Sequence, residues 1–287
     1  MLGGTRRSAT IGLVGLLAFV IAMVALGAAS GEVRPPVTTT DGRSVQIGER
    51  WPGALDECVT DETVDVLPNC YREPVHHGLL KQPVSTASTI AFCLVGLGIL
   101  VAVDGERARH GASSITTEQT WYGFVALFMG PGSALFHGTL TLWGGWFDQL
   151  SMYMLLAAIL AIDLVRLRPG SSFGRWWWMA VAVAAGLKAV SGEASTYVFI
   201  AVAVGVGVFA LVSWLRFLAR ANLVRSGRRL VLAYALLFSS IVPWLISNPA
   251  SGDPTDVPWH SMWHVLSALF VGAYWWYLRT ERSLSPA

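Results

Sequence analysis

The sequence predicts an all-α polytopic membrane protein, with a core of seven transmembrane helices and one extra N-terminal transmembrane helix or signal sequence. The first observation is composition: 54% of the 287 residues are hydrophobic and 13% are charged, against about 25% charged in soluble domains. The second is a series of apolar stretches of about 20 residues, the length that crosses a bilayer as a helix. The third is a bias of basic residues toward one side of these stretches. Composition therefore argues against a soluble enzyme, and a net charge of +2 argues against nucleic-acid binding.

Eight apolar stretches are the predicted spans, and each must be helical because backbone polar groups in lipid need internal partners. Their approximate limits are Ile11–Ala29, Ser85–Val103, Thr120–Leu140, Phe147–Val165, Trp176–Val190, Ser195–Phe217, Leu230–Ile246 and Trp259–Leu278. We divide the chain into an N-terminal signal or anchor helix (1–30), an extracytoplasmic acidic loop (31–84), a seven-helix membrane domain (85–279) and a cytoplasmic tail (280–287).

The first stretch has two interpretations. Arg6 and Arg7 precede it, and the small residues Gly27–Ala29 resemble a signal-peptidase site. Its apolar run is longer than the roughly 7–15 residues of a signal peptide, so we favour a retained anchor over a cleaved signal. Either interpretation places residues 31–84 outside the cytoplasm.

Basic residues predict the orientation. With the N-terminus inside, 14 of the 20 Lys and Arg residues fall in cytoplasmic segments, and the short outer loops are nearly free of them. This distribution follows the positive-inside rule. We therefore expect both termini in the cytoplasm, provided the first helix is retained. The Ala-, Gly-, Val- and Arg-rich composition suggests a bacterial plasma membrane.

The long outer loop is acidic and contains Cys58 and Cys70. Because thiols outside the cytoplasm tend to be oxidised, a Cys58–Cys70 disulfide is expected, with two free thiols as the alternative. Cys93 falls within a span, and we interpret it as a packing residue. The neighbouring His76 and His77 are expected to be solvated loop residues.

Ionisable residues inside the spans mark the candidate site, because such residues are costly in lipid and usually functional. His260 and His264 are spaced i, i+4 and share a helix face, as do Ser133 and His137. Alternating topology places His137, Asp148 and the His260/His264 pair at a similar depth in the outer leaflet. Three imidazoles from two helices match a catalytic zinc site, which commonly has three protein ligands and an open fourth position.

Other interpretations of these residues are less favoured. A role in packing alone does not explain why three histidines and one aspartate are expected at the same depth in the membrane. A Ser-His-Asp hydrolase would leave two histidines without a role, and Ser133 does not lie in a Gly-x-Ser-x-Gly nucleophile motif. A transporter is less favoured because the inner half lacks an ionisable relay.

At these residues the chain resembles the alkaline ceramidase family, within the superfamily of seven-helix intramembrane zinc hydrolases that also includes progestin- and adiponectin-receptor-like proteins. The resemblance covers roughly residues 70–280. A weaker match precedes the first core helix, at Cys70, Gln82-Pro83 and Ser85-Thr86-x-Ser88. The stronger motifs are Gly132-Ser133-x-x-Phe136-His137-x-Thr139-Leu140, Asp148 with Met152, and His260-x-x-Trp263-His264.

The resemblance implies a catalytic zinc held by His137, His260 and His264 with water as fourth ligand, assisted by Asp148 and Ser133. It implies hydrolysis of the linear amide of ceramide to a sphingoid base and a fatty acid. The chain departs from the family in two places. The calcium-binding acidic motif is altered around Cys70, with Glu73 displaced, so calcium is a less favoured second cofactor. Residues 248–258 contain no Cys, so a disulfide from the N-terminal segment to the last outer loop cannot form.

The expected mechanism uses Asp148 as proton acceptor and donor and Ser133 as hydrogen-bond donor to the developing oxyanion. Alternatively, Asp148 only orients a ligand histidine. A site at this depth suits a membrane-lipid substrate. The rival functions are hydrolysis of another N-acyl lipid or of an ester, and a receptor-like or haemolysin-like protein with a structural zinc. Such a zinc would be closed by a fourth protein ligand, for which Asp148 is the candidate.

Overall fold

The computed structural model describes residues 7–29, 37–38, 44–45, 73, 80–111, 114–168, 170–191, 195–221, 224–247 and 257–283. Within these ranges the regular secondary structure is helical apart from one short strand pair, β1 (Val37–Thr38) and β2 (Ser44–Val45). The helices are α1 (Arg7–Ala29), α2 (Pro83–Ser88), α3 (Ile90–His110), α4 (Ser114–Thr139), α5 (Leu142–Leu167), α6 (Phe173–Ser191), α7 (Ser195–Ala221), α8 (Val224–Ile246) and α9 (Trp259–Ser283).

Each predicted span is a long helix, which generally extends a few residues beyond the apolar stretch. The second span differs most, because the short helix α2 precedes α3 and the two are separated at Thr89. Pro83 suits the first position of α2, where a backbone N–H would have no helical partner. The strand pair was not predicted. It is antiparallel, with Val37 opposite Val45, and β-branched residues favour such extended backbone.

The chain is a polytopic all-α membrane protein. Five helical segments are long and apolar enough to cross a membrane: Arg7–Ala25, Pro83–His110, Trp143–Leu167, Tyr197–Arg216 and Gly227–Ile246. The remaining long helices α4, α6 and α9 have 26, 19 and 25 residues. Their hydropathy is lower because α4 and α9 carry the buried polar residues of the candidate site and α6 carries three consecutive Trp residues. That all eight cross the membrane stays a prediction.

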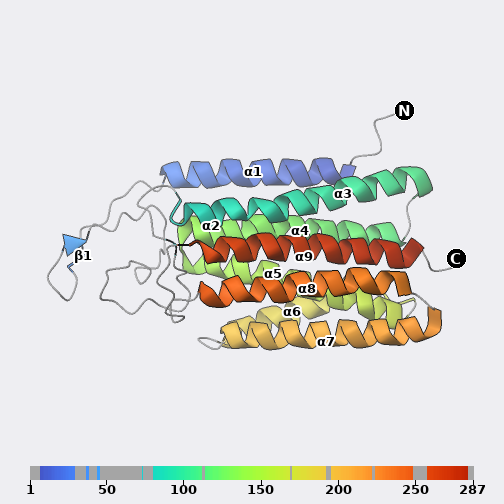
Figure 1. The fold of residues 1–287 in the computed structure, drawn as a ribbon. Coiled ribbons are helices and arrows are strands. Elements are labelled where there is room, and N and C mark those ends of the chain that lie inside the picture. Colours follow the sequence, from blue (N-terminus) through green and yellow to red (C-terminus); the bar gives the residue numbers. More distant parts are fainter. Residues whose placement is uncertain are drawn as a thin grey trace.

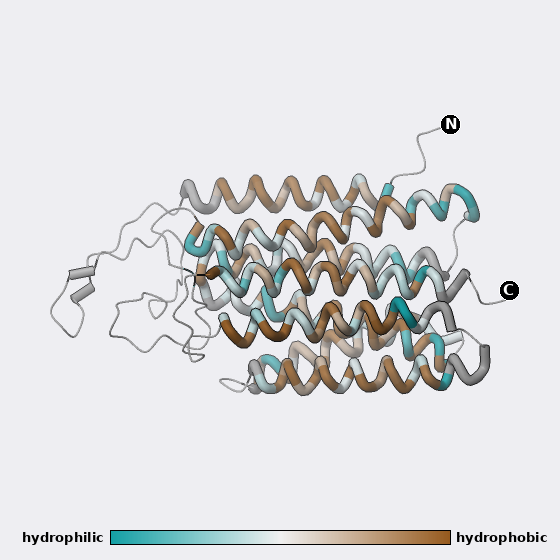
Figure 2. Tube along the Cα trace, in the orientation of Figure 1, coloured by the Kyte–Doolittle hydropathy of each residue, from teal (hydrophilic) through white to brown (hydrophobic). Residues whose placement is uncertain are grey.

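The long helices lie side by side with nearly parallel axes, and α1 and α7 occupy opposite edges of the bundle (Figure 1). Hydrophobic residues run along much of α1, α7 and α8, whereas hydrophilic residues gather mainly toward helix ends (Figure 2). Helix α1 begins and α9 ends at the same end of the bundle (Figure 1). At the opposite end α4 finishes, while α5 and α9 begin. This alternation brings the candidate site residues to one level of the bundle.

Helix α1 packs against α3 through specific contacts. The Ala9 N–H, in its first turn, donates to the buried carboxylate of Asp104 on α3, at 3.0 Å. Arg107 donates to the Ser8 hydroxyl at 3.2 Å. A Cβ at Gly12 would lie 2.9 Å from Leu100 of α3, so this glycine allows the two helices to pack closely. These contacts join α1 to the core, and its retention as an anchor stays a prediction.

Several residues for which the sequence made predictions are not among the residues that the structure describes. Cys58, Cys70, His76, His77 and most of the acidic loop lie outside the described residues. Cys93 is a buried free cysteine whose sulfur packs against Gly130 of α4, which agrees with the prediction of a packing residue.

Candidate metal centre

The three predicted histidines converge. His137 lies in the last turn of α4, and His260 and His264 lie in the first turns of α9. Their ring centroids are 4.7 Å (137–260), 5.0 Å (137–264) and 4.6 Å (260–264) apart. One ligand nitrogen from each ring lies within 4.8 Å of the other two. All three side chains are buried, at 0%, 2% and 0% exposure in chain order. The convergence predicted from spacing and topology is therefore confirmed.

Hydrogen bonds determine which nitrogen of His264 carries the proton. Its Nδ1 lies 2.6 Å from the Ser88 hydroxyl. That hydroxyl already donates its hydrogen to the carbonyl of Ser85, at 2.7 Å. Ser88 Oγ can therefore only accept from His264, so Nδ1 carries the proton and Nε2 retains its lone pair.

The same arrangement holds for His260. Its Nδ1 lies 3.4 Å from the Ser247 hydroxyl, which donates its own hydrogen to the carbonyl of Trp244 at 2.7 Å. The Nδ1 of His137 lies 2.7 Å from the carbonyl oxygen of the Gln82 side chain, which is an acceptor. In each ring Nδ1–H therefore donates outward, and Nε2 is left as a potential ligand atom.

The converging nitrogens fit a metal ion such as zinc. The Nε2 atoms of His137 and His260 are 3.1 Å apart, close to the roughly 3.3 Å between two nitrogens that coordinate one tetrahedral zinc with bonds of 2.0–2.1 Å. Lone pairs that meet in a buried space repel one another unless a cation or a proton lies between them. Outward hydrogen bonds that orient each ligand histidine are also typical of protein metal sites.

Ser133 and Asp148 lie beside these histidines. Ser133 Oγ is 3.2 Å from His264 Nε2, and the Asp148 carboxyl interacts with the Ser133 side chain. Gly132 permits this proximity: a Cβ there would lie 2.8 Å from the Cβ of Ser151 on α5. Because α5 approaches α4 so closely, Asp148 is brought next to Ser133. Asp148 is 6% exposed, and its Oδ1 has no hydrogen-bond partner in the part of the chain that the structure describes.

Asp148 stands apart from the ligand group. Among the described residues, three have donor atoms close enough to share one ion. These residues are His137, His260 and His264. Asp148 does not join them as a fourth member. Within the described residues, Asp148 therefore does not close the site as the fourth ligand that a structural zinc would need.

The segment before α3 supports the centre from one side. The backbone N–H groups of Lys81 and Gln82 donate to the carbonyls of Gly138 and His137, at 3.0 and 2.9 Å. Glu73 accepts from the backbone N–H groups at positions 84 and 85, at 2.6 and 2.7 Å. Both carboxylate oxygens of Glu73 therefore cap α2, and this capping positions Gln82 next to His137. Calcium binding near Glu73 stays untested.

Sequence reasoning did not assign roles to Gln82, Ser88 and Ser247. Gln82 and Ser88 occur in the weaker motif of the family resemblance. That motif marked them as notable residues but did not indicate that they orient the histidines. Ser247 follows α8 and offers no comparable signal, because serines near helix ends are common.

Comparison of the chain with protein-family models and with curated proteins finds no match.

Proposed function

We propose that the chain is a zinc-dependent intramembrane amidohydrolase, which cleaves the amide bond of ceramide or a related N-acyl lipid to a fatty acid and an amine. The observation that carries the proposal is the set of three buried imidazoles, each with one ligand nitrogen within 4.8 Å of the others, with Asp148 and Ser133 alongside. His137, His260 and His264 would hold the ion. A bound zinc ion supplies Lewis acidity toward the carbonyl and makes a water molecule more acidic.

Asp148 is the proposed proton carrier. It accepts a proton from the attacking water, whose oxygen bonds to the carbonyl carbon, and it delivers a proton to the nitrogen as the C–N bond breaks. The alternative role, orientation of a ligand histidine, has less support. Each Nδ1–H already has another acceptor, namely Gln82, Ser247 or Ser88.

Ser133 is the proposed donor to the developing oxyanion. It is one turn before His137 on α4, and its hydroxyl lies against His264 Nε2. A donor on a helix needs little reorganisation during the reaction, and loss of one such donor typically lowers the rate about 10²–10³-fold.

A lipid amide suits the position of the centre. The site lies near one end of a bundle with apolar spans, so acyl chains can stay in the hydrocarbon while the amide reaches the polar groups. A substrate with long alkyl chains would gain binding energy from this environment, at about 0.8 kcal/mol per buried CH₂ group. A water-soluble amide would not.

The test uses the purified full-length protein in detergent, with ceramide as substrate and both zinc content and released fatty acid as readouts. D148N is expected to retain zinc and lose about 10²–10⁴-fold in turnover. H260A is expected to lose both zinc and turnover. H110A is the matched control, because His110 is exposed at the far end of α3 and should change neither.

Three results would contradict parts of the proposal. Stoichiometric zinc without hydrolysis of any lipid amide would indicate a structural metal, as in a receptor-like protein. Cleavage of esters but not of ceramide would change the substrate class. Loss of zinc in D148N would assign Asp148 to the metal rather than to proton transfer.

A further inference from the structure

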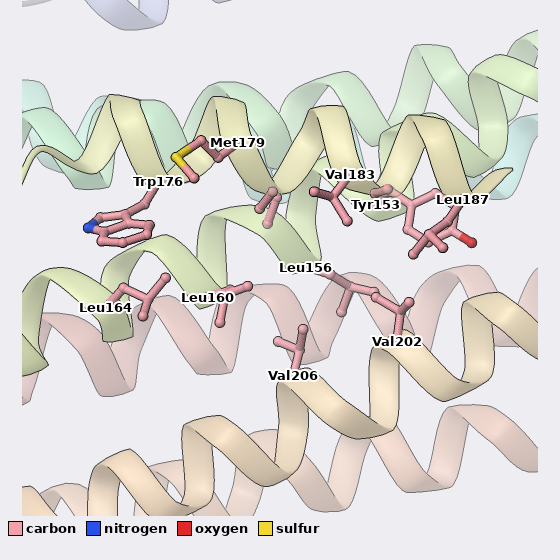
Figure 3. A pocket seen from close by; sticks show the side chains of 13 residues that line it. Tyr153, Leu156, Leu160, Leu164, Trp176, Met179, Val183, Leu187, Val202 and Val206 are labelled. Carbon is pink, nitrogen blue, oxygen red and sulfur yellow. The ribbon is translucent and has the colours of Figure 1, made fainter. Parts of the chain in front are cut away.

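An apolar groove runs between α5, α6 and α7, apart from the metal centre. Its volume is about 280 Å³, near the lower limit for small-molecule sites, and its lining is almost entirely hydrophobic. Figure 3 shows Trp176 and Leu164 at one end and Leu187 and Tyr153 at the other. The Tyr153 ring packs edge-on against Phe199, with centroids 5.4 Å apart, at that second end.

The length of the groove matches one membrane leaflet. Trp176 and Leu187 are eleven residues apart on α6, a rise of about 16 Å along a helix. Half of a bilayer core of about 30 Å is about 15 Å. A single alkyl chain that enters beside Trp176 would therefore reach the middle of the bilayer before it meets Tyr153.

Two arginines lie at the Trp176 end of the groove. The guanidinium carbons of Arg168 and Arg175 lie 5.7 and 6.0 Å from the centroid of the Trp176 ring. Both side chains are exposed. Helix α6 begins at Phe173, so the partial positive charge of its first turn adds to theirs.

These arginines differ from others at the same end of the bundle. Arg107, Arg166 and Arg279 form ion pairs with Asp104, Asp163 and Glu106. Arg168 and Arg175 have no carboxylate partner among the residues that the structure describes. Two positive charges without a carboxylate partner in the described structure therefore flank one indole ring, and that ring forms one end of the groove.

We propose that this groove is a binding site for an anionic phospholipid. One acyl chain lies along α5, α6 and α7, and the phosphate lies against Arg168 and Arg175, beside Trp176. The charge selects the ligand: a neutral lipid such as ceramide fills the groove equally well but gains nothing from the two arginines. The site is distinct from the metal centre, because its polar end lies at the opposite end of the bundle. The proposal therefore does not depend on hydrolytic activity.

The test is native mass spectrometry of the full-length protein in detergent, titrated with phosphatidylglycerol or with phosphatidylcholine of the same acyl chains. We expect tighter binding of phosphatidylglycerol. One basic side chain near a lipid surface contributes about fivefold to anionic-lipid binding, so R168Q/R175Q should weaken it about 25-fold. The matched control is R109Q/R228Q, which removes two exposed arginines at the same end of the bundle, away from the groove. Because these two arginines do not lie over Trp176, the control should weaken binding far less than R168Q/R175Q does.

A second variant tests the groove separately from the charge. A180L/A184L fills the groove with apolar side chains and retains both arginines. We expect it to lower phosphatidylglycerol binding at least tenfold, because the acyl chain no longer fits, with an unchanged melting temperature in lipid-free detergent. The melting temperature separates chain exclusion from misfolding.

Several outcomes would overturn the assignment. Equal binding of the two phospholipids would leave the arginines without a role, as would unchanged binding by R168Q/R175Q. Normal phosphatidylglycerol binding by a folded A180L/A184L would exclude the groove. Tighter binding of sodium oleate than of phosphatidylglycerol would identify the ligand as a fatty acid. None of these readouts uses zinc or ceramide, so they are independent of the proposed function.

Discussion

Replacement of Gln82 by Leu tests whether the contacts outside the metal centre are needed for ion binding. The side chain accepts the Nδ1–H of His137 at 2.7 Å, and both residues are 0% exposed. Leu has a similar volume but no acceptor, so the buried N–H loses its partner. Loss of such a partner typically costs about 1–3 kcal/mol, and comparable changes at metal sites lower metal affinity about 10–100-fold.

The assay is competition for zinc between the purified protein and a chelator of known affinity. Q82L is expected to bind zinc about 10–100-fold more weakly than the wild type. Q82E retains an acceptor for His137 and should stay within about threefold, since carboxylate–histidine–zinc arrangements are common. Q119L is the matched control: Gln119 is also buried on α4, and its Oε1 makes no hydrogen bond within the described structure. The reasoning would be refuted if Q82L and Q119L bound zinc as tightly as the wild type.

Four further predictions follow from the same structure. S133A should lower kcat for ceramide about 10²–10³-fold with zinc content unchanged; equal losses of zinc and turnover would show that Ser133 supports the ligands instead. G132A places a Cβ 2.8 Å from that of Ser151, so it should reduce both melting temperature and turnover, and a wild-type profile would mean that α4 and α5 can separate without loss. D104A removes the acceptor of the Ala9 N–H and should lower the free energy of unfolding by about 1–2 kcal/mol, measured by chemical unfolding. If α1 is a retained anchor, the intact mass of the purified wild-type protein should include it. Chelation should abolish turnover and lower the melting temperature, with recovery on addition of zinc, whereas activity that survives complete zinc removal would exclude the metal mechanism.

The helices were largely predictable because hydrophobicity and length are local properties of the chain. All eight predicted spans are helices, and α4 and α9 were found despite the polar residues that lower their hydropathy. The break between α2 and α3 was missed, since it depends on the segment around Gln82 bonding to the end of α4. The β1–β2 pair was missed because two-residue strands have almost no pattern of their own.

By itself, the sequence determined the helical membrane architecture and the convergence of His137 with His260 and His264. The i, i+4 spacing places two imidazoles on one face, and alternating topology brings the third to the same level. Only the tertiary structure decided which ring nitrogens face inward, because the acceptors that orient them, Gln82 and Ser247 among others, come from separate segments. The groove beside Trp176 likewise required three helices to be packed together, and no spacing within one helix encodes such a surface.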